Sequence, residues 1–330
     1  MAASDSADVE VQFTRQRAIE PGDATRAASW IIHEFPVPPD LAAALPTLLA
    51  KLLEREMLRG EVIEYIHSVS GRTTLAGFGL SGFLNDHIAA DYLAAPYPHF
   101  ELTLLDRVRR SDGGDVFLDH DQIAQANAGA GLTLFPLLWL QRSNDPAFAE
   151  THALLTASQQ GFLRIHRGYR IVRILKETTA DRASVFLGGG FREYRRLPIG
   201  TPMQFDGHAL RREHVVFEAS RADVETSLPA SMIAHLLTYQ PPRCSFTRSE
   251  RRVLERAVEH QTDEEIASSL RISSAAVRLR WRSIYARVAA HIPAVFKLTS
   301  SSAAVARGKE KRRRVIAYVA AHLEEIRPYP

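Results

Sequence analysis

The chain has 330 residues, of which 45% are hydrophobic and 24% are charged, and its formal net charge is +3. This length is sufficient for two domains, at least one of them with a sizeable core. The longest apolar run is far shorter than a membrane span, the acidic N-terminus is unlike a secretion signal, and one cysteine excludes an internal disulfide framework. We therefore expect a cytoplasmic protein without a membrane partner.

Residues 1–240 are expected to form one mixed α and β domain, because strand-like and helix-like hydrophobic patterns alternate along them. Pro241-Pro242 would end this domain, since proline can neither continue a helix nor donate to a strand ladder. In chain order we expect a strand at 9–13, helices at 23–34 and 39–59, strands at 62–68 and 73–80, a helix at 85–94, a strand at 100–105, a helix at 121–128 capped by Asp119, a strand at 132–140, a helix at 146–167, a strand at 169–176, a helix at 180–187 ended by three glycines, strands at 191–195 and 214–219, and a helix at 229–239.

The last part of this domain resembles a known fold. The run from the helix at 146–167 to Gly190-Phe191-Arg192 is similar to the end of the GNAT acetyltransferase fold. That family binds the diphosphate of acetyl-CoA with Arg/Gln-x-x-Gly-x-Gly/Ala at the start of a helix. Because Arg167-Gly168-Tyr169-Arg170 does not supply this motif, the resemblance implies a binding module without a cofactor. We expect an α+β sensor-like domain, with an acetyltransferase-like fold as an open alternative.

Two other sensor classes are set aside. A phosphate receiver needs acidic residues after its first strand, whereas the strand at 9–13 leads into Thr14-Arg15-Gln16-Arg17. An acyl-homoserine-lactone sensor has paired tryptophans, whereas Trp30 and Trp139 lie far apart in the sequence.

The ligand of this domain is an unidentified small-molecule effector or partner. Tyr92, Tyr97, His99 and Trp139 could line an apolar pocket with polar tips, although core packing is the more common role of such residues. Asp119-His120-Asp121 contains metal-binding residue types, but adjacent side chains point away from one another. We therefore expect a capped loop there and no metal site.

Residues 243–296 show a regular pattern of caps and apolar positions. Thr247-x-x-Glu250 and Thr262-x-x-Glu265 are capping boxes, and Ser273 is a third N-cap candidate. The apolar stripes behind them are Val253, Leu254 and Ala257, then Ile266, Ala267 and Leu270, then Val277, Trp281, Ile284, Tyr285 and Val288. Three short amphipathic helices with a tight second turn match helix-turn-helix geometry, with Trp281 in the core.

This segment resembles the C-terminal DNA-binding domain of LuxR-type (NarL/FixJ-type) bacterial regulators. The resemblance rests on Phe246-Thr247-x-x-Glu250-x-x-Val253-Leu254, on Thr262-x-x-Glu265-Ile266-Ala267-x-x-Leu270-x-Ile272-Ser273, on Val277-Arg278 and on Ile284-Tyr285. It implies an all-α helix-turn-helix domain that binds double-stranded DNA. His260 and Arg271 stand where the family usually has glycine, so we expect these turns to form without a glycine-specific conformation.

The third helix would read DNA with the face opposite the Trp281 stripe. This face carries Ala275, Leu279, Arg282, Ser283 and Ala286, and Arg278 and Arg280 lie on its flanks. Arg278 and Arg282 could bind guanine edges, whereas Arg280 and Thr262 are better suited to phosphates. The full set of expected DNA-binding residues is Thr262, Ser274, Ala275, Arg278, Leu279, Arg280 and Arg282. Charge supports this interpretation, because residues 243–330 contain 18 Lys and Arg against nine Asp and Glu, while residues 1–242 contain 23 against 29.

Residues 297–330 extend beyond the usual family length. A linker rich in Ser and Ala, 297–306, leads to Lys309-Glu-Lys-Arg-Arg-Arg314 and then to an amphipathic stripe. Cations at a helix N-terminus oppose the macrodipole, so either the helix begins after them or they bind a polyanion. Since an isolated helix of this length is marginal in water, the stripe should dock on a dimer partner or on the N-terminal domain.

Together these patterns predict a non-enzymatic, DNA-binding transcriptional regulator that acts as a homodimer and contacts RNA polymerase. Two alternatives stay open. One is an acyltransferase-like enzyme with an accessory DNA-binding tail. The other is a sigma-factor-like promoter-binding protein, against which the closing Ile284-Tyr285 argues.

Overall fold

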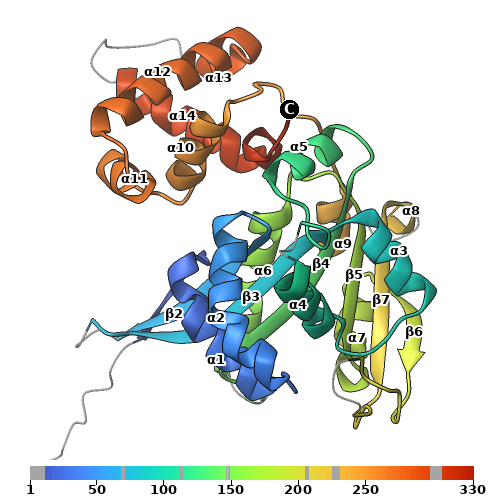
Figure 1. Ribbon diagram of the computed structural model, residues 1–330. Coiled ribbons are helices and arrows are strands. Elements are labelled where there is room, and N and C mark those ends of the chain that lie inside the picture. The colour runs from blue at the N-terminus through green and yellow to red at the C-terminus, as the bar shows by residue number, and fades with distance from the viewer. Residues whose placement is uncertain are drawn as a thin grey trace, which may run out of the picture.

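The computed structural model describes residues 12–67, 71–111, 114–145, 147, 149–204, 208–224, 231–297 and 307–330. Figure 1 shows two units: a unit with a central sheet up to residue 240, and an all-helical unit from residue 243. We call them the sheet unit and the helical unit.

The sheet unit contains a seven-stranded mixed sheet in the order β1-β2-β3-β4-β5-β7-β6. Among the described strands β4 and β5 run parallel, and the other neighbours are antiparallel. The strands are β1 Gln12–Ala18, β2 Leu58–His67, β3 Thr73–Leu84, β4 Leu132–Gln141, β5 Ile171–Thr179, β6 Arg192–Leu197 and β7 His214–Ser220. The expected α+β architecture is thus confirmed.

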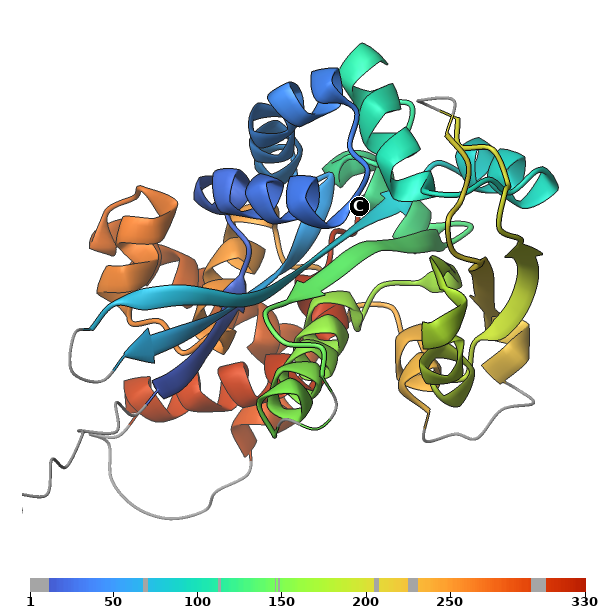
Figure 2. The same cartoon turned by 90° about the horizontal axis from the view of Figure 1, so that it is seen from below.

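Helices cover both faces of this sheet. Figures 1 and 2 show α1, α2 and α4 on one face and α6 with α9 on the other. The helices are α1 Ala24–Glu34, α2 Pro39–Glu54, α3 Asp86–Ala94, α4 Phe100–Ser111, α5 His120–Ala128, α6 Ala149–His166, α7 Ala183–Gly188, α8 Arg221–Val224 and α9 Met232–Leu237, with 3-10 turns η1 Pro21–Asp23 and η2 Ala180–Arg182. No helix in the described part of the chain combines the length and apolarity needed to cross a membrane.

Several expected elements of the sheet unit need correction. The strand expected at 100–105 is the start of α4, whose apolar residues are buried on more than one side, so their spacing resembled alternation. Arg15 and Arg17, taken to follow the first strand, lie within β1, while residues 9–11 fall outside the described residues. The helix expected to run to residue 59 ends at Glu54, and Leu58 begins β2.

The helical unit begins with three helices joined by short turns: α10 Arg248–Val258, α11 Asp263–Leu270 and α12 Ser274–His291. Both expected capping boxes are present, and the Ser273 hydroxyl accepts from the Ala276 N–H at 3.1 Å. Trp281 is 4% exposed, and its Nε1 donates to Asp263 Oδ1 at 3.1 Å. The expected caps and the core position of Trp281 are therefore confirmed.

The two turns of these helices use the left-handed backbone conformation without glycine. His260 has a φ of 65° and Arg271 a φ of 53°. The expectation that the absence of glycine would exclude this conformation is wrong. The backbone keeps it, although a Cβ makes it less favourable.

The C-terminal extension completes the helical unit. It contains α13 Ala294–Lys297, α14 Arg307–Ala321 and η3 Leu323–Ile326. Val315 and Val319 of α14 are fully buried in the core shared with α10 and α12. The amphipathic stripe thus docks on its own unit, where we had expected the N-terminal domain or a dimer partner. Residues 298–306 of the expected linker lie outside the described part.

The last residues of the chain join the two units. Arg327 donates from Nε to Arg167 O at 2.8 Å and from Nη2 to Arg164 O at 2.6 Å, at the carbonyl end of α6. The Asn127 amide donates to Pro328 O at 2.7 Å. Gly168 makes this approach possible, because a Cβ there would lie 2.4 Å from Glu324 N.

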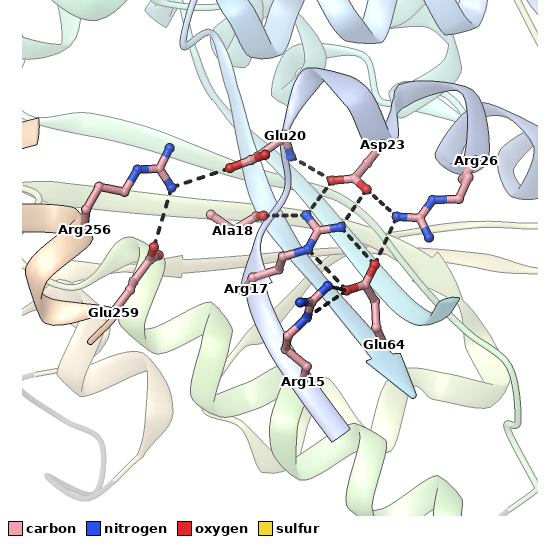
Figure 3. A network of polar contacts seen from close by, with 9 residues as sticks. All are labelled: Arg15, Arg17, Ala18, Glu20, Asp23, Arg26, Glu64, Arg256 and Glu259. Atoms are coloured by element: carbon pink, nitrogen blue, oxygen red, sulfur yellow. Dashed lines mark hydrogen bonds and ion pairs between the residues drawn. The ribbon is translucent and has the colours of Figure 1, made fainter. Parts of the chain in front are cut away.

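An ion-pair network lies at a second contact between the units (Figure 3). Glu64 of β2 is 2% exposed and pairs with Arg15, Arg17 and Arg26. Burial acts to raise the pKa of Glu64, but bonds from these arginines outweigh it and lower the pKa to about 2. At the edge of the network Glu20 pairs with Arg256 of α10 at 3.6 Å.

Candidate functional site

The parallel strands β4 and β5 separate after a short region of pairing. Register pairs join Leu132, Thr133 and Leu134 of β4 to β5, and the strands continue beyond them without pairing to each other. The amino group of Lys176 fills the gap, because Nζ donates to Pro136 O and Leu137 O at 3.0 Å each. A lysine side chain therefore takes the place of strand pairing in the middle of the sheet.

Glu177, the next residue of β5, is the centre of a buried polar cluster. Its carboxylate accepts from His214 Nδ1 at 2.6 Å and from Tyr92 Oη at 3.1 Å. It also accepts from the backbone N–H groups of His99 and Phe100, at 2.8 and 3.0 Å, and so caps α4. Glu177, His214 and Tyr92 are each less than 10% exposed.

His99 extends this cluster to a second carboxylate. Its ring lies 4.9 Å from the ring of His214, and its Nδ1 is 3.3 Å from Glu101 Oε1. Burial raises the pKa of Tyr92 well above its ordinary value, and it lowers the pKa of Lys176 against the opposing effect of Glu101 and Glu177. Burial acts to raise the pKa of Glu101, but the contact with His99, the charge of Lys176 and a backbone hydrogen bond together lower it.

This arrangement has the properties of an acid–base site. Because a carboxylate only accepts, the contact of His214 Nδ1 with Glu177 places a proton on Nδ1. Tyr92, Lys176 and Glu101 beside this pair are buried groups with a shifted pKa, and such groups are typical of catalytic sites. Two clefts in the described part of the chain lie away from this cluster: one of about 450 Å³ between α2 and α4, and one of about 280 Å³ between the units.

A diphosphate would need free backbone N–H groups at the start of a helix, and α6 is the helix that follows β4. The sequence from 142 to 148, between them, contains no glycine. Its Asp145 Oδ1 accepts from the Ala147 N–H at 2.9 Å, so a carboxylate already occupies an amide that a phosphate would need. Arg167-Gly168-Tyr169-Arg170 follows the end of α6 and contacts the C-terminal tail. The residues present therefore do not fit the diphosphate of acetyl-CoA.

Of the expected pocket residues, the structure brings together Tyr92, Tyr97 and His99, with the rings of Tyr92 and Tyr97 5.5 Å apart. Trp139 instead packs against a separate group that contains Ile63 and Leu154. Asp119 caps α5 as expected, and His120 Nδ1 lies 2.7 Å from Glu56 Oε2. Sequence reasoning missed Glu177 and His214, since they are 37 positions apart and follow no motif spacing.

The expected DNA-binding residues lie at the N-cap of α11 and along α12. Leu279 is 66% exposed, although a large apolar side chain normally avoids water. Ser274 and Arg280 are half-buried, and the exposed members of the set are Thr262, Ala275, Arg278, Leu279 and Arg282. The face opposite the Trp281 stripe is thus open at Ala275, Leu279 and Arg282, and exposed Arg278 lies on its flank, one helical turn from Arg282.

Comparisons with known proteins add the following. No protein-family model matches the chain, and no curated protein matches it. Arabidopsis thaliana NAA60, solved with a bisubstrate analogue, is 12% identical, with 63% of this chain and 98% of that chain covered and a TM-score of 0.37. Ribosomal-protein-S5-alanine acetyltransferase of Vibrio fischeri is 12% identical over 64% and 97%, with a TM-score of 0.34. FeeM, an N-acyl amino acid synthase from uncultured soil microbes, is 11% identical over 68% and 98%, with a TM-score of 0.35.

These results correct two sequence-based interpretations. The chain was expected to be a non-enzyme and a LuxR-family transcription regulator, whereas the three solved structures named are acyl-transferring enzymes. Neither interpretation is kept. Because identities of 11–12% and TM-scores of 0.34–0.37 transfer no activity to this chain, its function is argued from its own residues.

Proposed function

We propose that the chain is an acyltransferase-like enzyme with an accessory DNA-binding tail. The observation that supports the enzymatic part is the Glu177–His214 pair, in a buried acid–base cluster where β4 and β5 separate. The expected run of a helix, a strand, a second helix and Gly190-Phe191-Arg192 is also present, as α6, β5, α7 and the start of β6.

The reaction we propose is acyl transfer from a thioester to an amine. The amine nitrogen attacks the carbonyl carbon, so a C–N bond forms and the C–S bond breaks. His214 takes the amine proton on Nε2, because Glu177 holds its Nδ1–H, and returns it to the leaving thiolate. Since Asp145 already accepts from the Ala147 N–H ahead of α6, the donor would be recognised by its acyl and thioester parts.

Thiol release by the full chain tests this reaction. The acyl donors are acetyl- and octanoyl-CoA and the matching pantetheine thioesters. The acceptors are amino acids, a polyamine and a lysine peptide, and mass spectrometry identifies the amide product. We expect pantetheine thioesters to serve as well as CoA thioesters. Glu177→Gln and His214→Gln should lose roughly 100-fold or more in turnover, while Glu193→Gln, on exposed β6, should not. A parent protein that forms no amide, or a Glu177→Gln variant as active as the parent, would contradict the proposal.

The DNA-binding part rests on the exposed face of α12. We propose that α11 and α12 are the helix-turn-helix. Arg278 and Arg282 would contact base edges, whereas Thr262 and Arg280 would contact phosphates. Selection from random duplexes with the full chain should return one sequence motif. Arg278→Ala and Arg282→Ala should each relax the preference at one position of this motif, and each should lose about 1–3 kcal/mol of binding free energy on the parental site. Thr262→Ala and Arg280→Ala should lower the affinity for all DNA sequences by the same factor. An unchanged motif for both arginine variants would show that they do not read bases.

A further inference from the structure

The basic cluster of the C-terminal extension lies inside a helix, at its unfavourable end. From the sequence, α14 could begin either before or after these cations. In the structure α14 begins at Arg307, so Lys309, Lys311 and Arg313 lie in its first two turns. Cations near a helix N-terminus oppose the macrodipole. The one acidic residue among them, Glu310, pairs with both Arg313 and Arg314. The cluster therefore keeps a positive surplus.

Arg312 anchors the N-terminal turns of α14 to the start of α11. It donates to Gln261 O at 3.0 Å and pairs with Asp263 Oδ1 at 3.1 Å. These two residues flank Thr262, the N-cap of α11. The first turns of α14 are thus placed beside the helix N-terminus to which we assign a phosphate contact.

Helical geometry separates the remaining cations into two groups. Lys309 and Arg313 are i, i+4 neighbours on one side of α14, next to Arg312. Lys311 is on the other side, toward α13, since its Nζ lies 5.8 Å from the centre of the Phe296 ring. Lys309 is exposed, and the Arg313 side chain is 78% exposed. Lys309 and Arg313 therefore lie on a solvated edge on the side of α11, and the edge stays positive because Glu310 offsets only one of their two charges.

We infer that α14 extends the DNA interface, with Lys309 and Arg313 bound to backbone phosphates beside the segment that α11 and α12 contact. This inference rests on the proposed DNA-binding function. The partner is duplex DNA, because its phosphates continue past the groove that holds α12 and would neutralise the cations that the helix itself disfavours. These contacts contribute affinity and no sequence preference, because phosphates are alike at every base pair.

The test compares two double variants of the full chain that remove the same charge. Lys309→Gln with Arg313→Gln removes the positive edge. Arg195→Gln with Arg196→Gln removes two cations from β6, which lies far from α11 and α12 in Figure 1. Affinity for a 30-base-pair duplex is measured by fluorescence anisotropy over a KCl series. Melting temperatures check that both variants fold.

For the α14 variant we expect the slope of log K against log salt to become shallower by about 2, since each phosphate contact contributes about 0.9. The selected DNA motif should stay that of the parent, and the β6 variant should keep the parental slope. Equal slopes for the parent and the α14 variant, or an equal change in both variants, would overturn the inference. A parent that shows no salt-dependent duplex binding would instead overturn the DNA-binding function itself.

Discussion

Gly161 of α6 lies against the carboxylate of Glu61 in β2 so closely that a Cβ on Gly161 would be 1.3 Å from Glu61 Oε2. Glu61 is 3% exposed and accepts from Gln16 Nε2 at 2.5 Å. Helix and sheet therefore meet here through a buried carboxylate, and the approach requires a residue without a side chain.

Gly161→Ala should accordingly destabilise the sheet unit. The added methyl group would displace Glu61 or lift α6 from the sheet, and overpacking of this kind costs about 1–3 kcal/mol. The control is Gly188→Ala, because no atom lies within 4 Å of a Cβ at Gly188. Urea unfolding should show a lower midpoint for Gly161→Ala and a nearly parental one for Gly188→Ala. Equal midpoints would mean that the contact carries no strain.

The burial of Glu61 also predicts a pH dependence. Burial raises the pKa of Glu61 to about 7, against the opposing effects of Gln16 and Arg164. Because the folded-state pKa lies above the unfolded value of 4.5, this group stabilises the fold below about pH 4.5, and the contribution is lost as the pH rises through about 7. Melting temperatures between pH 4.5 and 8 should fall less for Glu61→Gln than for the parent. Identical pH profiles would contradict a buried, protonated Glu61.

The left-handed residues of the helical unit predict a gain in stability. Arg271 and His260 hold a conformation that costs a residue with a Cβ about 1–2 kcal/mol, and glycine avoids most of this cost. Arg271→Gly and His260→Gly should each raise the free energy of unfolding by about 0.5–1 kcal/mol. Arg271→Ala separates the backbone effect from loss of the guanidinium, and it should give no gain. If Arg271→Ala and Arg271→Gly melt alike, the turn stores no strain.

Trp281 should be essential for folding of the helical unit. It is buried between α10, α11 and α12, and its Nε1 bond to Asp263 ties α12 to the start of α11. Trp281→Ala should cost about 3–5 kcal/mol, a large share of the stability of so small a unit. Circular dichroism of the full chain should show lost helix, with DNA binding lost as a consequence. Leu279→Ala, 66% exposed on the same helix, should melt like the parent. A Trp281→Ala variant with parental melting but no DNA binding would place Trp281 on the DNA face.

Local signals explain which features could be predicted from the sequence. The capping boxes at Thr247 and Thr262 and the Trp281 stripe depend on residues within one or two helical turns, so the helices of the helical unit could be predicted from the sequence. Helix α4 could not be predicted, because its N-terminus at Phe100 is capped by Glu177, which is 77 positions away. The Glu177–His214 pair forms only when β5 and β7 become neighbours. Pairings between distant positions leave no local pattern, and the acid–base cluster consists of such pairings.

The helical unit is attached to the sheet unit at several points. Besides the ion pairs of α10 with Glu20 and Glu56, two neighbouring attachments are the chain itself at 238–243 and the Arg327 contact with the carbonyl end of α6. Glu325 draws the two together, since its carboxylate accepts from the backbone N–H groups of Arg243 and Cys244 at 3.0 Å each. A body attached at one point can swivel in any direction, whereas attachments at separate points restrict rotation about every axis. The tail contact and the ion pairs of α10 with Glu20 and Glu56 are such separate points, so they restrict how the helical unit can turn against the sheet unit.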